Sequence, residues 1–431
     1  MSLEIFERIE SEVRGYVRNF PAVFDTAEGS YLYDVDGNAY LDFFAGASVL
    51  NYGHNHPELQ KALIEYISRN GITHSLDMAS KAKAEFLEAF HRYILAPRNM
   101  AHKIQFPGPT GTNSVESALK LARKVKGREK IISFTNAFHG MTLGSLSVTG
   151  NAFKRGGAGL SLTHSDSMPF CNYFGDEIDT IDYLDRLIED SGSGVDLPAA
   201  VIVETVQAEG GINVADFDWL HRLQEVCRKY DMLFIVDDIQ VGCGRTGKFF
   251  SFDEIGLDPD IICLSKSLSG FGLPLAVTLI KPELDIWEPG EHNGTFRGHN
   301  LAFVTATKAL ELFWSNDTLA RETEAKGEMM ARELQRIVNK YPQAPGTVKG
   351  RGMLRGIDFE NVELAGKVSE VAFESKLIIE TSGPESNVLK LLPPLTISEA
   401  DLRKGLEIID RSVGEALNRL GAAPDKTASG S

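Results

Sequence analysis

Cysteine is scarce in this chain of 431 residues, which contains four of them. None pairs as C-x-x-C, so the sequence suggests neither a zinc site nor a thioredoxin-like redox site. Four cysteines in so long a chain are also too few to hold a fold together by disulfide bonds. We therefore expect reduced, mostly buried thiols and no bound metal. The four are Cys171, Cys227, Cys243 and Cys263.

Long apolar runs and an excess of basic residues are missing as well. No run approaches the roughly 18 apolar residues that a membrane span needs. Residues 1–7 are acidic and amphipathic, whereas a signal peptide begins with a basic region followed by an apolar one. The formal charge of −16 disfavours nucleic acid as a partner, because phosphate binding needs a basic surface. We expect a cytoplasmic protein with neither a membrane nor a nucleic acid as partner.

The chain exceeds the roughly 250–300 residues at which single cores stop growing, so we expect more than one domain. Short β-branched runs alternate with helical patterns over residues 61–317, which predicts an α/β domain with a mainly parallel sheet. Residues 318–420 combine a long helical pattern with glycine-rich strands, which predicts a small α+β domain. We expect residues 1–60 to pack with that small domain and residues 421–431 to form a disordered tail.

Local patterns predict the individual elements. Two aromatic-rich runs around Asp36-Gly37 predict a hairpin over residues 31–43. Residues 3–18 predict one short amphipathic helix. The strands expected in the large sheet are 103–106, 130–134, 199–204, 232–236, 261–264 and 275–280.

The segment 242–247 matches the dinucleotide-binding pattern G-x-G-x-x-G. That pattern requires a helix to begin at the loop and an acidic residue about 20 positions later, at the end of the next strand. Lys-Phe-Phe-Ser-Phe at 248–252 does not resemble a helix start, and the next predicted strand ends in Ser265-Lys266. The loop therefore does not predict a dehydrogenase.

Two charged side chains follow predicted strands of the sheet. Asp237 comes after the run 232–236, and Lys266 comes after the run 261–264. In open α/β sheets the carboxyl ends of the strands are where ligands bind. Burial between leucines would lower the pKa of the lysine and make it a usable nucleophile. A lysine and an aspartate at this edge are the parts of a pyridoxal phosphate site, with a purely structural ion pair as the alternative.

Two further segments lie beside predicted strands. The turn 107–114 opens the predicted helix 115–125 with glycine and hydroxyl side chains, which suits a phosphate because helix starts offer free N–H groups. It lacks the Gly-Lys-Ser/Thr ending of a nucleotide-binding P-loop. Phe138 and His139 follow the strand 130–134, where an aromatic ring could stack on a cofactor. Helix capping and core packing are the structural alternatives for these segments.

These elements, in this order, resemble the class III (ω-amino acid) aminotransferases of fold-type I, over nearly the whole chain. The resemblance implies a large, mainly parallel α/β domain that binds pyridoxal 5′-phosphate (PLP) and a small α+β domain made from both termini. The motifs that carry it are Phe138-His139-Gly140, Glu204 with Glu209-Gly210-Gly211, Asp237-Asp238-Ile239-Gln240, Gly244-Arg245-Thr246-Gly247, Ser265-Lys266 and Gly294-Thr295-Phe296.

The resemblance also implies a role for each matching residue. Lys266 would bond covalently to the cofactor and act as the catalytic base, and Asp237 would pair with the ring nitrogen. Thr295 would reach the phosphate held by a partner subunit, so the family predicts a homodimer or a tetramer. The remaining cofactor contacts would come from Gln240 at the ring oxygen, Phe138 with His139 and Ile239 around the ring, and Gly111 with Thr112 at the phosphate.

Substrate binding would involve Glu209 and Lys390. By family analogy, the Glu209 carboxylate pairs with a cation when glutamate is absent and moves aside when glutamate binds. Lys390 stands where several members carry an arginine, and a lysine cannot make the planar bidentate clasp of a guanidinium. Arg297 and Arg355 are alternative cations for the substrate carboxylate.

Four further stretches, at 51–57, 106–113, 204–207 and 290–298, narrow the resemblance. They are similar to the members that move an amino group from L-glutamate to L-aspartate 4-semialdehyde, the first step of ectoine synthesis in osmoadaptation. An aminomutase, or an aminotransferase of siderophore or polyamine metabolism, is an alternative with the same cofactor. A non-catalytic binding protein of this fold is the third, and it would lack the lysine.

Overall fold

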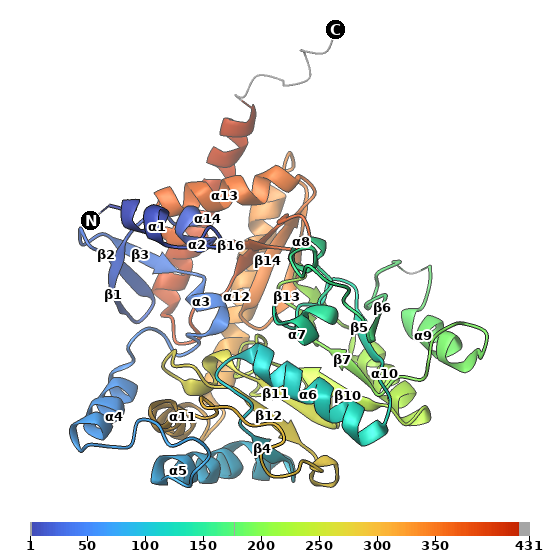
Figure 1. The fold of residues 1–431 in the computed structure, drawn as a ribbon. Helices are drawn as coiled ribbons and strands as arrows, with labels where there is room; N and C mark the ends of the chain where they lie inside the picture. The colour runs from blue at the N-terminus through green and yellow to red at the C-terminus, as the bar shows by residue number, and fades with distance from the viewer. Residues whose placement is uncertain (1, 176, 422–431) are drawn as a thin grey trace.

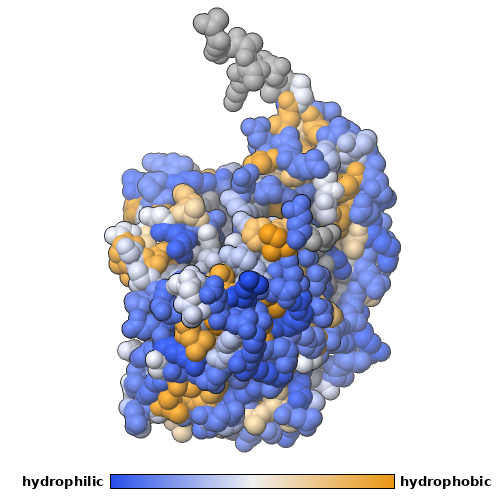
Figure 2. All heavy atoms as spheres, turned by 90° about the vertical axis from the view of Figure 1, so that its right-hand side faces the viewer, coloured by the Kyte–Doolittle hydropathy of each residue, from blue (hydrophilic) through white to orange (hydrophobic). Residues whose placement is uncertain are grey.

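The computed structural model of the chain describes residues 2–175 and 177–421. Figure 1 shows a large sheet flanked by helices, next to smaller sheets to which both ends of the chain contribute. The tail predicted from residue 421 lies, beyond that residue, outside the described part. Among the described helices, none is both long enough and apolar enough to cross a membrane. The face seen in Figure 2 is mostly hydrophilic, with scattered apolar patches.

The large sheet has seven strands in the order β4-β12-β11-β10-β7-β5-β6. The strands from β11 to β6 are parallel, and β12 runs antiparallel to both β11 and β4. The mainly parallel α/β sheet predicted from the alternating pattern is therefore confirmed. The strands are β4 (Lys103–Gln105), β5 (Ile131–Phe134), β6 (Ser165–Met168), β7 (Ala200–Val203), β10 (Leu233–Asp237), β11 (Ile261–Leu264) and β12 (Val277–Ile280).

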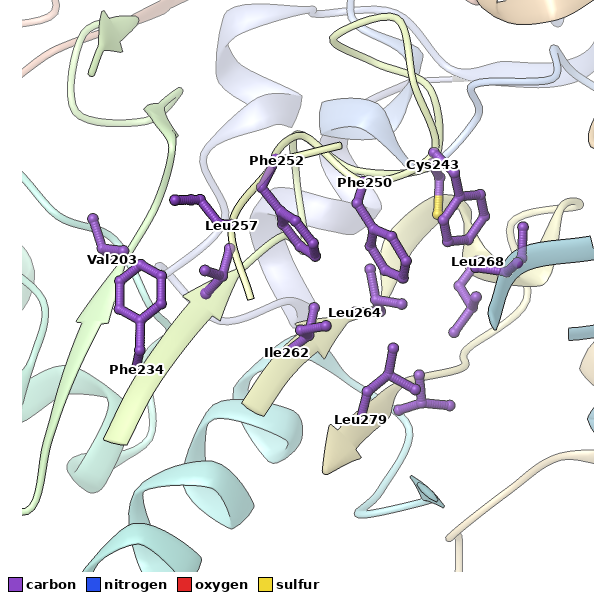
Figure 3. Packing of buried hydrophobic residues seen from close by; sticks show 14 of the residues in the cluster. Val203, Phe234, Cys243, Phe250, Phe252, Leu257, Ile262, Leu264, Leu268 and Leu279 are labelled. Carbon is purple, nitrogen blue, oxygen red and sulfur yellow. The ribbon is translucent and has the colours of Figure 1, made fainter. Parts of the chain in front are cut away.

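Burial on both faces explains why the central strands are continuous apolar runs. Along β10, Phe234 packs into one core cluster and Ile235 into another on the opposite face. Figure 3 shows the first of these faces, where side chains from β7, β10, β11 and β12 pack together. Helix α10 (Phe217–Lys229) covers that face, and helix α6 (Gly111–Lys126) covers the other.

The residues after 317 form an antiparallel sheet in the order β13-β14-β17-β16. Three long helices share an apolar core with it. The strands are β13 (Gly346–Arg351), β14 (Leu354–Phe359), β16 (Glu380–Ser382) and β17 (Val388–Leu391), and the helices are α12 (Thr318–Lys340), α13 (Val362–Glu374) and α14 (Glu399–Gly421).

Another sheet joins the two ends of the chain in the order β1-β2-β3-β15. Strand β3 pairs in parallel with β15, so that Leu41 lies opposite Leu377. The antiparallel pair β2–β3 is the hairpin predicted around Asp36-Gly37. The strands are β1 (Phe24–Glu28), β2 (Tyr31–Asp34), β3 (Ala39–Asp42) and β15 (Leu377–Ile378).

The remaining elements are short or peripheral. They are α3 (Ala45–Ser48), α4 (Pro57–Ser68), α5 (Lys81–Phe90), α7 (Leu143–Ser147), α8 (Ala152–Gly156), α9 (Thr180–Glu189), α11 (Asn300–Phe313) and the two-stranded pair β8 (Val206–Gln207) and β9 (Asn213–Val214).

Two local expectations differ from the structure. The single helix predicted over residues 3–18 is wrong: α1 (Glu4–Ile9) and α2 (Tyr16–Asn19) are separate, and neither contains a buried residue. A segment that buries no apolar face has little tertiary packing to stabilise a longer helix. Strand β6 was not predicted, because its sequence Ser-Asp-Ser-Met is polar and lies at the sheet edge.

The glycine-rich loop 242–247 forms turns, and no helix begins there, as its sequence predicted. The reason for its shape is Arg245, whose side chain is completely buried. Its guanidinium donates to the Pro393 carbonyl at 2.6 Å, to the Asn51 side chain at 2.6 Å and to the Ser48 hydroxyl at 2.9 Å. The loop thus ties the N-terminal and C-terminal parts of the chain to the large sheet.

Candidate active site

A cavity of about 150 Å³ lies at the carboxyl ends of β5, β7, β10 and β11. This is the edge of an open α/β sheet where ligands bind. Apart from Thr295, every residue that the sequence predicted to bind the cofactor lines it. The lining residues are Gly111, Thr112, Phe138, His139, Gly140, Glu204, Asp237, Ile239, Gln240, Val241 and Lys266.

Lys266 begins a short 3₁₀ turn directly after β11. Its φ of +51° is in the left-handed region, which residues other than glycine rarely adopt, and such strain is frequent at functional sites. The turn is held by Ser267, whose hydroxyl donates to the Ser48 carbonyl at 2.8 Å. Burial lowers the pKa of Lys266 to about 8, although Glu209 pulls it upward. The amine is therefore partly neutral, and able to act as a nucleophile, near neutral pH.

Asp237 is the last residue of β10 and is buried. Its Oδ2 lies 2.7 Å from Nδ1 of His139, and its Oδ1 accepts a hydrogen bond from the Ile239 amide at 3.1 Å. Because an ionised carboxylate can only accept, Nδ1 of His139 is the donor of this pair. The Nε2 atom of His139 is buried and has no partner among the described residues.

The start of α6 also lines the cavity, through Gly111 and Thr112. Thr110 caps the helix, and its amide donates to the Asn113 side chain at 3.1 Å. The hydroxyl of Thr112 contacts two others, those of Thr142 at 2.8 Å and Ser145 at 2.7 Å. A Cβ at Gly140, where φ is +133°, would collide with Thr112, so this position requires glycine. The arrangement offers amide and hydroxyl donors to an anionic group.

Phe138 lies between two residues that the sequence did not single out for the cavity. Its amide donates to Glu204 at 3.0 Å, and the Lys154 ammonium lies 4.1 Å from the centre of its ring. Burial, with Asp237 nearby, raises the pKa of Glu204 well above its ordinary value. Lys154 belongs to α8 and is not among the residues that line the cavity.

Next to the cavity lies a buried cluster of charges centred on Lys390. Its Nζ is 2.6 Å from Glu209 and 3.0 Å from Glu380. Gln240, which lines the cavity, donates to the same Glu209 oxygen at 2.9 Å. Sequence reasoning identified Glu209 and Lys390 but missed Glu380, which no motif marks.

Opposite charges of this cluster stabilise one another, although burial outweighs Lys390 at Glu380 and raises the pKa of that carboxyl above its ordinary value. Burial would raise the pKa of Glu209, but the Lys390 and Lys266 ammonium groups outweigh it and hold the value at about 2. Burial would lower the pKa of Lys390, but the two carboxylates raise it well above its ordinary value. Lys390 therefore remains an ammonium ion.

The other predicted residues lie elsewhere. The Thr295 carbonyl accepts a hydrogen bond from His74 at 2.8 Å, and Thr295 is not among the residues lining this cavity. Arg297 contacts Asn293 and Asp77. Arg355 donates to backbone carbonyls of its own hairpin, those of Gly350 and Gly352. Neither arginine joins the cluster around Lys390.

The residues present fit PLP on three observations. The cavity places an amine and a buried acid on adjacent strands, as the aldehyde and the ring nitrogen of the cofactor require. An aromatic ring lines its wall. A helix start with hydroxyl groups lines the same cavity and could hold a phosphate.

Comparisons with known proteins agree with this site. The family model described as aminotransferase class III matches residues 14–413. A diaminobutyrate–2-oxoglutarate transaminase from Streptomyces avermitilis is 59% identical over 414 residues, covering 96% of this chain and 98% of the relative. The protein of the same name from Halalkalibacterium halodurans is 57% identical over 411 residues, covering 95% and 96%.

Solved structures match the fold over the same extent. An ornithine aminotransferase from Toxoplasma gondii, described with partial occupancy of PLP at its active site, has a TM-score of 0.84 at 26% identity and covers 97% of this chain and 94% of its own. A transaminase from the marine bacterium Virgibacillus has a TM-score of 0.86 at 24% identity, covering 97% and 99%. The chain belongs to the class III aminotransferases, with the fold of the type I PLP enzymes. Its cofactor is pyridoxal 5′-phosphate.

Proposed function

We propose that this enzyme moves an amino group from L-glutamate to L-aspartate 4-semialdehyde, giving L-2,4-diaminobutyrate and 2-oxoglutarate. The observation that carries the proposal is the identity of 55–60% with diaminobutyrate–2-oxoglutarate transaminases along nearly the whole chain. Ectoine synthesis, and hence osmoadaptation, is the pathway we propose for the product. The acidic composition suits a salt-rich cytoplasm.

When bound, PLP supplies an aldehyde that joins to amines and a ring that withdraws electrons from the carbon bearing the amine. Lys266 is the amine that we propose anchors the cofactor between reactions. Once a substrate amine replaces it, the neutral Lys266 Nζ would take the proton from the substrate carbon that bears the amine. It would then give that proton to the carbon of the former cofactor aldehyde. A pKa near 8 suits this exchange at neutral pH.

The other lining residues orient the group. Asp237 would keep a proton on the ring nitrogen, and His139, whose Nδ1 lies 2.7 Å from Oδ2 of Asp237, would hold the carboxylate in position. Phe138 and Ile239 would pack against the cofactor ring, and Gln240 would hydrogen-bond the ring oxygen. Gly111 and Thr112 would hold the phosphate at the start of α6.

Two different substrates must use one site, and we propose that Glu209 makes this possible. Glutamate presents an α-carboxylate beside its reacting carbon, whereas the 4-amino end of diaminobutyrate does not. The 2.6 Å contact between Glu209 and Lys390 would remain closed for diaminobutyrate. It would open for glutamate, whose carboxylate then takes the place of Glu209 beside Lys390.

Assembly and location also form part of the proposal. Thr295 lies away from the cavity of its own subunit, which suits a contact to the phosphate of a partner in a homodimer or tetramer. We propose a cytoplasmic enzyme. We also propose a large cofactor-binding domain at 61–317 and a small domain at 318–420, with residues 1–60 packing against the latter.

The test is product analysis with purified enzyme and PLP. L-glutamate and L-aspartate 4-semialdehyde should give equal amounts of 2-oxoglutarate and L-2,4-diaminobutyrate. Longer diamines and their aldehydes serve as competing substrates. A clear preference for these would contradict the proposal and favour a role in polyamine metabolism.

A further inference from the structure

Buried polar groups form a continuous line from the cofactor cavity to the N-terminal helix α2. Gln240 contacts Glu209, Glu209 contacts Lys390, and Lys390 contacts Glu380. The Tyr16 hydroxyl lies 3.4 Å from Glu380 at the outer end. The Lys390 side chain is fully buried, and Glu380 is only 6% exposed. One ammonium is thus enclosed between two carboxylates.

The two carboxylates are held in different ways. Glu380 is on β16 directly opposite Lys390 on β17, so the register of two paired strands fixes their separation. Glu209 is in the loop after β8, with its backbone carbonyl accepting from Gly383 at 3.1 Å. Glu209 is also the carboxylate nearer the cavity, because its hydrogen-bond partner Gln240 lines the cavity. Glu209 is therefore placed to move, and Glu380 is not.

A moving Glu209 creates an electrostatic problem for Lys390. A buried ammonium that loses its counter-ion is strongly destabilised, and lysine responds by losing its proton or changing its position. An arginine would keep its charge and its planar fork, but a lysine side chain is a flexible stem with a single charged atom. Lys390 therefore needs a second carboxylate that remains in place during the exchange.

We propose that Glu380 is a positioning residue that keeps the Lys390 ammonium charged and in place while Glu209 and the glutamate carboxylate exchange beside it. The inference rests on the proposed function, because it assumes that Glu209 opens for glutamate. Glu380 touches neither the cofactor cavity nor the reacting atoms and acts through Lys390. It makes a lysine sufficient where an arginine would otherwise be needed.

The charge of Glu380 also affects how glutamate binding depends on pH. The charged or titratable groups around Lys390 are Glu209, Glu380 and Lys266, and the Tyr16 hydroxyl contacts Glu380. Removing the Glu380 charge leaves Lys390 with one counter-ion and a like charge nearby. Its pKa then falls, and the ammonium is lost at a lower pH than in the parent enzyme. Glutamate binding would weaken at alkaline pH, and binding of diaminobutyrate would not.

The experiment compares two amino donors on the PLP-loaded enzyme in single turnovers. L-glutamate and L-2,4-diaminobutyrate both bleach the absorbance of the lysine-linked cofactor, and each gives an apparent dissociation constant across a pH series. In Glu380→Gln we expect the apparent dissociation constant for glutamate to rise about tenfold or more, as when one partner of a buried ion pair is removed. We also expect the alkaline limb, the loss of glutamate binding as the pH rises, to shift to lower pH. The diaminobutyrate constant should change little.

Two further variants complete the design. Glu380→Asp keeps the charge one methylene further away, so it should retain the alkaline limb and weaken glutamate binding only partly. It also replaces Glu380→Gln if that protein does not fold. Ser382→Ala changes a buried residue of the same strand and should leave both donors unaffected. Thermal unfolding of all variants measures any general damage.

Outcomes separate the two proposals. If the parent enzyme is bleached by neither donor, or by diaminobutyrate alone, the proposed function fails whatever Glu380 does. If the parent uses both donors and Glu380→Gln affects them equally, or affects neither, the role of Glu380 is overturned. An unchanged alkaline limb in Glu380→Gln would also overturn it. A selective loss of glutamate binding, partly restored in Glu380→Asp, supports it.

Discussion

His139 and Asp237 form a buried pair with Nδ1 and Oδ2 2.7 Å apart, where the β10 strand meets the cavity. We propose that this contact orients Asp237 toward the ring nitrogen of bound PLP. In His139→Leu the carboxylate loses a donor, and hydrogen bonds to charged groups contribute about 1.5–3 kcal/mol. We expect kcat with glutamate to fall about tenfold to a hundredfold. His139→Asn, which keeps a donor, is the matched control, and an unchanged kcat in His139→Leu would contradict the assignment.

Lys266 is the residue that we propose anchors the cofactor and acts as the base. Lys266→Ala should lose the yellow absorbance of the lysine-linked cofactor and essentially all turnover, because neither the anchoring amine nor the base remains. Absorbance spectra and product assays measure both effects. Lys248→Ala removes a lysine that pairs with Glu324 away from the cavity and should retain both. Retained catalysis without Lys266 would rule it out as the base.

The lowered pKa of Lys266 predicts how covalent loading of the apoenzyme depends on pH. The ammonium form cannot attack the aldehyde, and the neutral amine can. With a pKa of about 8 in the folded protein, the neutral fraction increases as the pH rises through that value. The loading rate should therefore rise roughly tenfold from pH 7 to pH 9 and then level off. A rate still climbing steeply above pH 9 would indicate an ordinary lysine.

The Lys154 ammonium lies 4.1 Å from the centre of the Phe138 ring. Such cation–π contacts contribute about 1 kcal/mol. Lys154→Ala should loosen the ring and weaken PLP binding roughly fivefold, as measured by titrating the apoenzyme with the cofactor. Lys340→Ala removes a similar contact to Tyr341 at the C-terminal end of α12, outside the cavity lining, and should leave PLP binding unchanged. Equal effects of the two variants would show that the contact does not act through Phe138.

Arg245 should matter for stability more than for chemistry. Its buried guanidinium donates to the Ser48 and Asn51 side chains and to the Met353 and Pro393 carbonyls, which come from three separate parts of the chain. Arg245→Met leaves these acceptors without a donor, so we expect the free energy of unfolding to fall by about 3 kcal/mol or more. Denaturant titration measures it. A loss below about 1 kcal/mol would mean that water replaces the donor.

The sequence allowed the centre of the site to be predicted because strand ends are local signals. Runs of buried β-branched residues located Asp237 and Lys266 at the ends of β10 and β11, and parallel pairing then brings them to one edge. Glu380 and Lys154 could not be found in this way. Lys390 follows Glu380 by 10 positions and Phe138 precedes Lys154 by 16, but no motif marks either pair, and strand register or loop packing alone brings the two members together.

The fold was predictable to a similar degree and for similar reasons. Burial on both faces makes central strands conspicuous, whereas the polar edge strand β6 differs little from a loop. Residues 3–18 show the opposite error, because the pattern predicts one helix and the structure has two short ones. Apolar residues of this segment, such as Ile9 and Val13, repeat at a helical spacing but remain exposed, so the pattern had no packing to sustain it.

The parallel pairing of β3 with β15 has a consequence for how the protein is made. Tyr40 and Lys376, which meet across this junction, are 336 positions apart in the chain. The ribosome therefore releases β1, β2 and β3 long before β15 is synthesised, and the edge of β3 stays unpaired during that time. In a chain truncated before β15 the edge of β3 would stay unpaired, and the protein would then tend to aggregate.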